Sequence, residues 1–232
     1  MLKALAIIPA RGGSKRLPGK NIRSFYGRPV IEYSIRAAQQ AGCFEEIMVS
    51  TDDPAIAAVA TSCGAAVPFL RSAQNASDTS STADALLEVL AGYRQMGREF
   101  PLCCCIYPAA PLVSFKRLRQ AYELLLSSSV DSVFPVLSFG YPIWRALKLE
   151  GGKARMIWPE HAGARSQDLP PAFHDAGQFY FLRTARFLLE QKLFMADSRV
   201  LEIPSSEGQD IDTEEDWKIA EAKFGILSKG GL

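Results

Sequence analysis

The N-terminal segment imposes the strongest constraint on the fold. An apolar run, residues 4–8, leads directly into a glycine-rich loop with four cations: Arg11, Lys15, Arg16 and Lys20. No acidic residue precedes Glu32, so residues 1–31 hold seven lysines and arginines and no carboxylate. Glycines let backbone N–H groups approach a ligand closely, and the cations offset a dense negative charge. A strand, such a loop and then a helix suit phosphate binding, so we predict a nucleotide triphosphate site.

The spacing of this loop differs from both familiar phosphate motifs. A Walker loop needs four residues between its glycines and then Gly-Lys-Ser/Thr. Five residues separate Gly13 from Gly19 here, and Asn21 stands where the hydroxyl residue should be. The dinucleotide pattern G-x-G-x-x-G is absent as well. On spacing alone, a solvated basic loop after a strand remains an alternative.

Apolar runs alternate with helical patterns along most of the chain. We predict strands near residues 4–9, 46–51, 102–107 and 132–137, and helices near residues 29–41, 53–63, 80–97, 115–127 and 213–224. Asp52 or Asp53, followed by Pro54, is typical of a helix start. Continuous apolar strands that alternate with helices predict an α/β fold with a mostly parallel sheet flanked by helices. Ligands of such sheets bind beyond the carboxyl ends of the strands, where the 10–21 loop belongs.

This alternation stops between about residues 139 and 178. The stretches 139–144, 147–158 and 178–182 predict short strands, joined by polar loops and a Gly151-Gly152 turn. Since crossover helices are lacking, we predict a small antiparallel insertion, after which the chain rejoins the main sheet near 178–182. We expect one composite domain, residues 1–232. The aromatic residues Tyr141, Trp144 and Trp158 would form a seam against a second subunit.

Composition excludes several classes of protein. The net charge of +1 provides no overall field for nucleic acid or an anionic membrane. The first 30 residues lack a signal-peptide core, and no 18-residue apolar stretch could span a membrane. The five cysteines lack metal-type spacing, and Cys103-Cys104-Cys105 lies in an apolar run, which predicts buried structural thiols in a reducing cytoplasm.

Acidic residues gather near the other end of the chain. Residues 202–216 hold seven carboxylates and no cation. Asp210 and Asp212 are the strongest metal candidates, because two carboxylates with phosphate oxygens and waters suit Mg²⁺. The alternative is that they are turn or helix-capping carboxylates before the helix predicted at 213–224.

Several blocks resemble one family. Pro9-Ala-Arg-Gly-Gly-Ser-Lys-Arg-Leu-Pro-Gly-Lys-Asn21 is similar to the opening motif of the CMP-sugar synthetases, the cytidylyltransferases that activate sialic acids and related sugars. Four later blocks resemble further family motifs in the family's order: Val49–Asp52, Ala76–Thr79, Arg165–Pro170 and Asp210–Thr213. The resemblance implies a Rossmann-like nucleotidyltransferase in which a sugar hydroxyl attacks the α-phosphate of CTP and pyrophosphate leaves. It further implies Mg²⁺ as the cofactor and a homodimer whose insertion lends residues to the neighbour's site.

The resemblance also assigns residues to the two substrates. On the nucleotide side these are Ala10, Arg11, Gly12, Lys15, Lys20, Asn21, Arg71, Asp78 and Thr82. Arg11 and Lys15 would neutralise the triphosphate and, with the metal ligands Asp210 and Asp212, form the catalytic set. On the sugar side they are Tyr107, Arg165, Gln167, His174, Asp175 and Tyr180. The planar fork of Arg165 suits a carboxylate, whereas Asp78 has a second interpretation as the N-cap of the next helix.

The choice of sugar depends on smaller differences. Sialic acid synthetases usually carry Gln where this chain has Tyr107, and the stretches 104–107, 141–145 and 174–180 resemble instead the pseudaminic acid branch, which serves bacterial flagellar and surface glycans. Sialic, legionaminic or Kdo-like acids remain alternatives, as does a nucleotide-binding regulator without catalysis. A Ser-His-Asp hydrolase is disfavoured, because the chain has two histidines, His161 and His174, and no G-x-S-x-G elbow.

Overall fold

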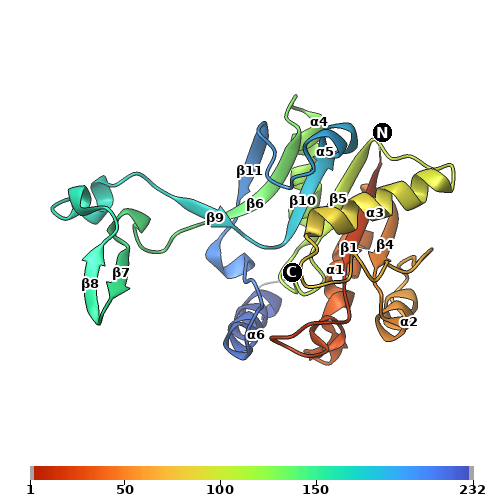
Figure 1. The fold of residues 1–232 in the computed structure, drawn as a ribbon, viewed down its shortest axis with the longest axis horizontal. Coiled ribbons are helices and arrows are strands. Elements are labelled where there is room, and N and C mark those ends of the chain that lie inside the picture. Colours follow the sequence, from red (N-terminus) through yellow and green to blue (C-terminus); the bar gives the residue numbers. More distant parts are fainter. Residues whose placement is uncertain (1–2, 230–232) are drawn as a thin grey trace.

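The computed structural model describes residues 3–229. A central sheet with helices on both faces forms the body, and a thin arm leaves it at one end (Figure 1). The strand order is β11-β6-β10-β5-β1-β4, with the short β9 paired to β6. The strands are β1 (Ala4–Pro9), β4 (Phe44–Ser50), β5 (Leu102–Ile106), β6 (Ser132–Ser138), β9 (Phe173–Asp175), β10 (Phe179–Arg183) and β11 (Ser198–Glu202).

The strand directions bring the loops that follow several strands to one edge of the sheet. β1 is parallel to β4 and β5, and β11 is parallel to β6, whereas β10 is antiparallel to both β5 and β6. The carboxyl ends of β1, β4, β5, β6 and β11 therefore share an edge with the amino end of β10. Segments that are far apart in the sequence meet there, which is the arrangement that α/β enzymes use for ligands.

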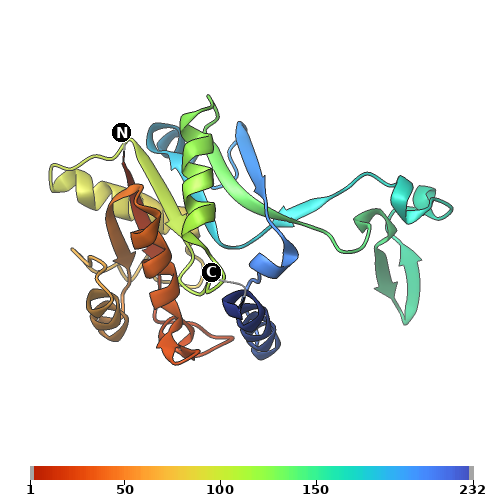
Figure 2. The same ribbon diagram turned by 180° about the vertical axis from the view of Figure 1, so that it is seen from behind.

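The helices form a layer on each face of the sheet, as the two opposite views show (Figures 1 and 2). One face packs against α1 (Val30–Ala41), α2 (Pro54–Ser62) and α4 (Phe115–Leu126), and the other against α3 (Thr82–Gln95) and α5 (Thr184–Glu190). Successive residues of β1 alternate between the two layers: Ala6 and Ile8 join the first core, while Leu5 and Ile7 join the second. All four are fully buried.

The helix α6 (Glu214–Lys229) packs on the N-terminal loop rather than on the sheet. Trp217 lies 5.5 Å from the ring of Phe25, and the guanidinium of Arg23 lies 4.3 Å over the Trp217 ring while pairing with Glu214. Leu17 and Ile211 belong to the same buried cluster. This packing holds the acidic 208–213 segment against the basic loop, although nearly the whole chain separates them.

Most of the predicted elements are confirmed. The predicted strands correspond to β1, β4, β5 and β6, the chain rejoins the sheet in β10, and the predicted helices correspond to α1–α4 and α6. Asp53 caps α2 by accepting from Ala55 N at 2.8 Å. The strand predicted at 139–144 is wrong, because those residues form an extended linker and the 3₁₀ turn η2 (Ile143–Arg145). The prediction also lacked α5, β9 and β11.

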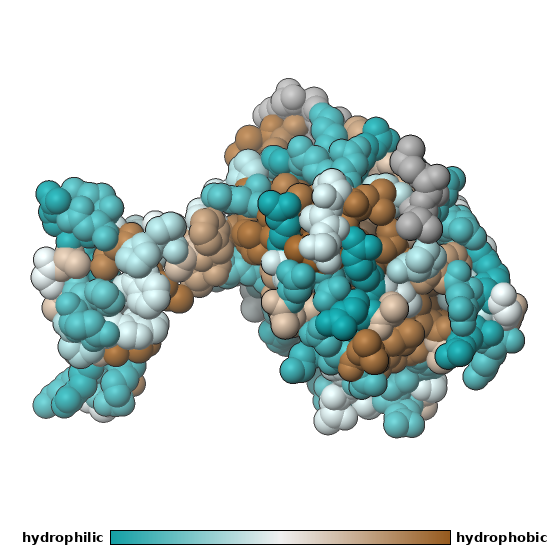
Figure 3. Space-filling model, turned by 90° about the horizontal axis from the view of Figure 1, so that it is seen from above, coloured by the Kyte–Doolittle hydropathy of each residue, from teal (hydrophilic) through white to brown (hydrophobic). Residues whose placement is uncertain are grey.

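The arm, residues 139–172, projects away from the body and returns through β9 (Figure 1). It contains the hairpin of β7 (Leu147–Glu150) and β8 (Lys153–Met156) and the short turns η3 (Pro159–His161) and η4 (Ser166–Asp168). From above it forms a separate lobe with hydrophobic residues among polar ones (Figure 3). Tyr141 is 87% exposed, whereas Trp144 and Trp158 pack on each other at 5.5 Å.

The five cysteines are reduced, and most of them lie in the core. All five are free thiols, and Cys103, Cys104 and Cys105 are buried in β5, where desolvation raises the pKa of each thiol. These thiols therefore behave as core residues, as the sequence predicts. Between residues 3 and 229, no helix combines the length and the apolar character needed to cross a membrane.

Candidate active site

The basic loop is anchored to the end of β4. Ala10 N donates to Ser50 O at 2.9 Å, and Gly12 N donates to the carboxylate of Asp52, also at 2.9 Å. Further along, Asn21 Nδ2 closes the loop on itself by donating to Arg11 O at 2.9 Å. The loop thus leaves the sheet in a defined conformation, with Leu17 buried and the cations around a hollow.

This hollow, the basic cavity, has a volume of about 630 Å³. Five segments of the chain contribute to its lining: the basic loop, the loop before α3, the residues that follow β5, the turn at Gly177 and the 210–212 segment. The predicted site residues that line it are Arg11, Lys15, Lys20, Asn21, Asp78, Tyr107, Asp210 and Asp212. The structure therefore brings together the cations and the carboxylates that the sequence singled out.

Two of the three aspartates that line the basic cavity, Asp78 and Asp212, form ion pairs with loop cations. Asp78 pairs with Lys15 and, at 3.4 Å, with Arg11, and the hydrogen bond from Lys15 holds the pKa of Asp78 below its usual value. Asp212 lies 2.9 Å from Arg16 and 3.6 Å from Lys20. Because these pairs are largely solvent-exposed, each is weak, so a ligand with several negative charges can replace the carboxylates as partner of the cations.

The 210–212 segment suits a divalent cation. The pKa of Asp210 is raised, first by desolvation and next by the negative charge of Asp212, while Lys20 opposes the shift. Gly177 approaches so closely that a Cβ there would lie 3.3 Å from Asp210, and its φ of +62° favours glycine. Carboxylate oxygens are the ligands that Mg²⁺ prefers, and it is usually held by one or two carboxylates together with substrate phosphates. Within residues 3–229, no three His, Cys, Asp or Glu side chains form a group that could hold a metal ion by themselves.

Asn21 carries an unpaired hydrogen-bond acceptor beside the basic cavity. Its side chain is buried and lines the basic cavity, yet its Oδ1 has no hydrogen-bond partner among the described residues. A buried acceptor without a donor costs about 1–3 kcal/mol. The unpaired oxygen makes Asn21 a candidate acceptor for a hydrogen-bond donor on a ligand in this cavity.

Some predicted nucleotide residues lie behind the cavity wall. Arg71 is buried and donates from Nη2 to Ser50 O at 2.6 Å, and burial lowers its pKa. Ala10 is fully buried, and neither Gly12 nor Thr82 lines the cavity. These residues shape the strand ends around the site.

The second interpretation of Asp78, as a helix cap, is wrong. The N-cap of α3 is Ser81, which forms a reciprocal capping box with Asp84. Asp210 and Asp212 do not cap α6 either, because the carboxylate of Asp216 accepts the hydrogen bonds from the backbone N–H groups at the start of that helix. This carboxylate accepts from Thr213 N at 2.8 Å and from Asp212 N at 3.1 Å.

A second hollow, the acidic cavity, adjoins the first and shares Asp210 and Asp212 with it. Its volume is about 520 Å³, and its lining includes His174, Asp175, Asp216 and Lys223. The predicted sugar residues His174 and Asp175 thus lie next to the aspartate pair. We expected no role for Lys223, although its spacing of seven from Asp216 puts both on one helix face.

Two predicted sugar residues lie between the cavities and the core. Tyr180 is buried and donates its hydroxyl hydrogen bond to Asp175, and its ring lies 5.7 Å from that of Tyr107. Burial raises the pKa of Tyr107 to about 12, opposed by side-chain hydrogen bonds with Thr82 and Tyr180. Both phenols are therefore neutral hydrogen-bonding groups at neutral pH.

Arg165 and Gln167 are placed differently from the other sugar residues. Both lie in the arm, and neither lines the basic or the acidic cavity. Arg165 is exposed and pairs with Asp168 of the same turn at 2.6 Å. Their position leaves them available to a neighbouring molecule.

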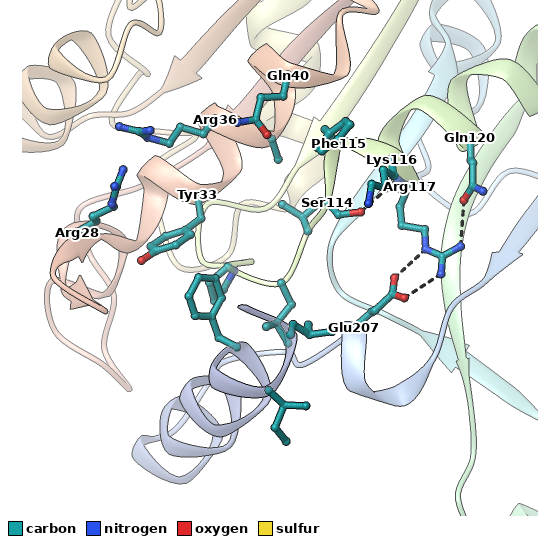
Figure 4. A pocket seen from close by; sticks show the side chains of 17 residues that line it. Arg28, Tyr33, Arg36, Gln40, Ser114, Phe115, Lys116, Arg117, Gln120 and Glu207 are labelled. Carbon is teal, nitrogen blue, oxygen red and sulfur yellow. Dashed lines mark hydrogen bonds and ion pairs between the residues drawn. The ribbon is translucent and has the colours of Figure 1, made fainter. Parts of the chain in front are cut away.

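A larger cavity, of about 930 Å³, lies between α1, the start of α4 and α6 (Figure 4). None of the predicted site residues lines it. On its wall Arg117 pairs with Glu207 through two hydrogen bonds of 2.7 and 2.8 Å. The side-chain amide of buried Gln178 donates to Glu207 O at 2.5 Å, and the backbone carbonyl of Gln178 accepts from Tyr107 N. These contacts, which the sequence gave us no reason to expect, support the segment that leads to Asp210.

Comparisons with known proteins identify the family. A cytidylyltransferase family model matches residues 5–148. The chain is 39% identical over 226 residues to a pseudaminic acid cytidylyltransferase of Campylobacter jejuni, with 97% of both chains covered. It is 38% identical over 231 residues to a CMP-N,N'-diacetyllegionaminic acid synthase of Legionella pneumophila, with 95% of each covered. The chain therefore belongs to the cytidylyltransferase family and is a nucleotidyltransferase.

The fold agrees with this assignment. A solved structure of CMP:2-keto-3-deoxy-manno-octonic acid synthetase in complex with CTP superposes with a TM-score of 0.70, covering 97% of this chain and 99% of that one. At 18% sequence identity, the likeness shows the fold alone. The predicted Rossmann-like α/β class is thus confirmed.

The unpaired Asn21 oxygen leads to a first prediction. Asn21→Ala should weaken CTP binding about tenfold or more, because a ligand donor loses its acceptor. Thermal stability should change little, since the lost bond to Arg11 O is offset by removal of a buried unpaired group. Calorimetric titration with CTP and a melting curve test both points. Unchanged CTP affinity would mean that the ligand does not reach Asn21.

Proposed function

We propose that this member of the cytidylyltransferase family transfers the cytidylyl group of CTP to pseudaminic acid, for the synthesis of bacterial flagellar or surface glycans. The observation that carries the proposal is the pair of adjoining cavities that share Asp210 and Asp212. A triphosphate suits the basic cavity, and the acceptor sugar suits the acidic one. The full-length similarity to a pseudaminic acid cytidylyltransferase supports the choice of sugar.

At the α-phosphorus of CTP, the reaction forms one bond and breaks one. The sugar hydroxyl oxygen forms a bond to the α-phosphorus of CTP, and the bond from that phosphorus to the oxygen bridging to the β-phosphate breaks. The hydroxyl proton is released and pyrophosphate departs. Such a transfer depends on positioning and charge neutralisation rather than on a covalent intermediate. Arg11 and Lys15, released from Asp78, would bind the triphosphate and stabilise charge on the departing pyrophosphate.

Asp210 and Asp212 would hold Mg²⁺ between the two cavities. When bound, the ion offsets negative charge on the triphosphate and lowers the repulsion of the incoming nucleophile. Lys20 supports this arrangement by donating to Ile211 O at 2.6 Å, between the two aspartates. Asp216 supports it from the other side through its bond to Asp212 N.

We further propose one composite domain whose arm forms a homodimer interface. The arm and its base expose several large apolar side chains: Phe139, Tyr141, Leu147, Leu149, Ile157 and Phe173. Exposed apolar groups concentrated on a projecting element are typical of protein contacts. In such a dimer Arg165 and Gln167 would complete the partner's sugar site, and Arg165 would meet the sugar carboxylate.

A second candidate sugar is supported by one observation. The legionaminic acid synthase relative is nearly as similar in sequence as the pseudaminic acid enzyme. Both sugars are acidic and would use the same cavities. We place the reaction in the cytoplasm, because CTP is made there and the five free thiols suit a reducing compartment.

The proposal is tested by pyrophosphate release from CTP and Mg²⁺. We expect release with pseudaminic acid and much slower release with N-acetylneuraminic or legionaminic acid, because the full-length similarity to a pseudaminic acid cytidylyltransferase favours that sugar. Preference for another acidic sugar would overturn the substrate assignment. Tight CTP binding with no product from any of the acids would favour the regulator hypothesis.

The metal assignment predicts a specific loss. Asp212→Ala should reduce kcat by about a hundredfold or more, since positioned charge stabilisation contributes on that scale. Folding should persist, because the Asp212 side chain is partly exposed and its ion pairs are with the exposed Arg16 and, at a longer 3.6 Å, with Lys20. Glu215→Ala, an exposed carboxylate in the first turn of α6, is the matched control and should be near wild type. Near-normal kcat in Asp212→Ala would remove this residue from the mechanism.

The dimer proposal predicts complementation between two defective subunits. Arg165→Ala should raise the KM for the sugar far more than that for CTP, and Asp212→Ala should be inactive. In a random mixture each heterodimer would contain one intact site, so low-sugar activity should recover to about one quarter of wild type. Activity no higher than the sum of the separate variants would show that the arm does not serve a neighbour.

A further inference from the structure

Lys223 is a cation without an ionic partner in the acidic cavity. Its Nζ donates to Gly208 O at 2.7 Å and to Gln209 Oε1 at 3.1 Å, and both acceptors are neutral. Four aspartates line the same cavity, yet no described carboxylate forms an ion pair with it. Lys223 is the only lysine or arginine among the described residues that line this cavity, so its ammonium group is the group there that can attract an anionic ligand.

The chemistry of the acceptor indicates which anion belongs there. In an acidic sugar of this class, the carboxyl group sits on the carbon that bears the reacting hydroxyl. That carboxylate must therefore lie within a few ångströms of the point where the α-phosphate meets the acceptor. Asp210 and Asp212 mark this point, because they line both cavities, and Lys223 lines the acceptor side of it.

We propose that Lys223 binds the carboxylate of the acceptor sugar and selects acidic over neutral sugars. The inference rests on the proposed function. An ammonium group has three donors, and the structure uses two of them on the loop, which leaves one for the ligand. A carboxylate has two oxygens, so it can accept from Lys223 of its own subunit and from Arg165 of the partner subunit together.

A purely structural role for Lys223 has different consequences. Its bonds to the Gly208 carbonyl and to the Gln209 side chain hold the segment next to Asp210, so their loss would first disturb the proposed metal ligands. In that case kcat would fall and the Mg²⁺ requirement would rise, with the sugar KM little changed. Carboxylate binding predicts the opposite: a raised sugar KM with the Mg²⁺ and CTP dependence preserved.

The test compares three variants of the full-length enzyme. Lys223→Met removes the charge and keeps most of the side-chain length, Lys223→Arg keeps the charge, and Lys218→Met is a control on the exposed face of the same helix. We expect Lys223→Met to raise the KM for pseudaminic acid about 10- to 100-fold. Lys223→Arg should recover part of this loss, and Lys218→Met should match the wild type.

A binding measurement separates this inference from the proposed function. Pseudaminic acid is titrated into each protein with Mg²⁺ and a non-hydrolysable CTP analogue, and its methyl ester serves as the uncharged probe. We expect the methyl ester to bind the wild type weakly and to bind Lys223→Met with the same low affinity. Equal binding of the acid by the wild type and Lys223→Met would overturn the role of Lys223 alone. Failure of the wild type to bind any acidic sugar would overturn both proposals.

Discussion

The burial of β1 between two parallel neighbours determines where everything else can lie. Its residues from Ala4 to Ile8 are wholly inaccessible to solvent, with β4 on one side, β5 on the other and helices over both faces. Parallel neighbours require crossover connections, so the carboxyl ends of these strands must emerge at the same edge. The glycine-rich loop leaves β1 at that edge, and Ser50 at the end of β4 holds it through Ala10 N.

Charge brings the two ends of the chain together at this edge. Lys20 Nζ donates to Ile211 O across 191 residues of sequence, and Arg16 and Lys20 both face Asp212. The apolar contacts of Trp217 and Phe25 supply most of the stability of this junction, because exposed ion pairs contribute little. The ion pairs can therefore exchange partners for a ligand without loss of the fold.

The sequence predicted the elements whose signal is local. β1 and β5 are continuous apolar runs, and the loop cations and the Asp210–Asp212 pair stood out by their segregated charge. Asn21, Asp78 and Tyr107, which also line the basic cavity, were chosen only by resemblance to family motifs. The edge strand β11 was missed because Arg199, Val200 and Glu202 are all exposed and no apolar face marks it. The position of Arg165 could not be predicted either. It is nine residues before His174, yet the projection of the arm separates the two.

The two halves of the site are built by different means, which explains why the reaction is easier to infer than the sugar. Backbone groups at strand ends hold the loop that we propose for the nucleotide, through bonds such as Gly12 N to the carboxylate of Asp52 and Ala10 N to Ser50 O. The glycines and cations of this loop stand in one short segment, so they can be recognised in the sequence. The acidic cavity, which we propose for the sugar, takes side chains from β9 and the distant helix α6, such as His174 and Lys223. Lys223 becomes visible as a site residue only once α6 is known to lie beside Asp210, so the three-dimensional arrangement carries the information about the sugar.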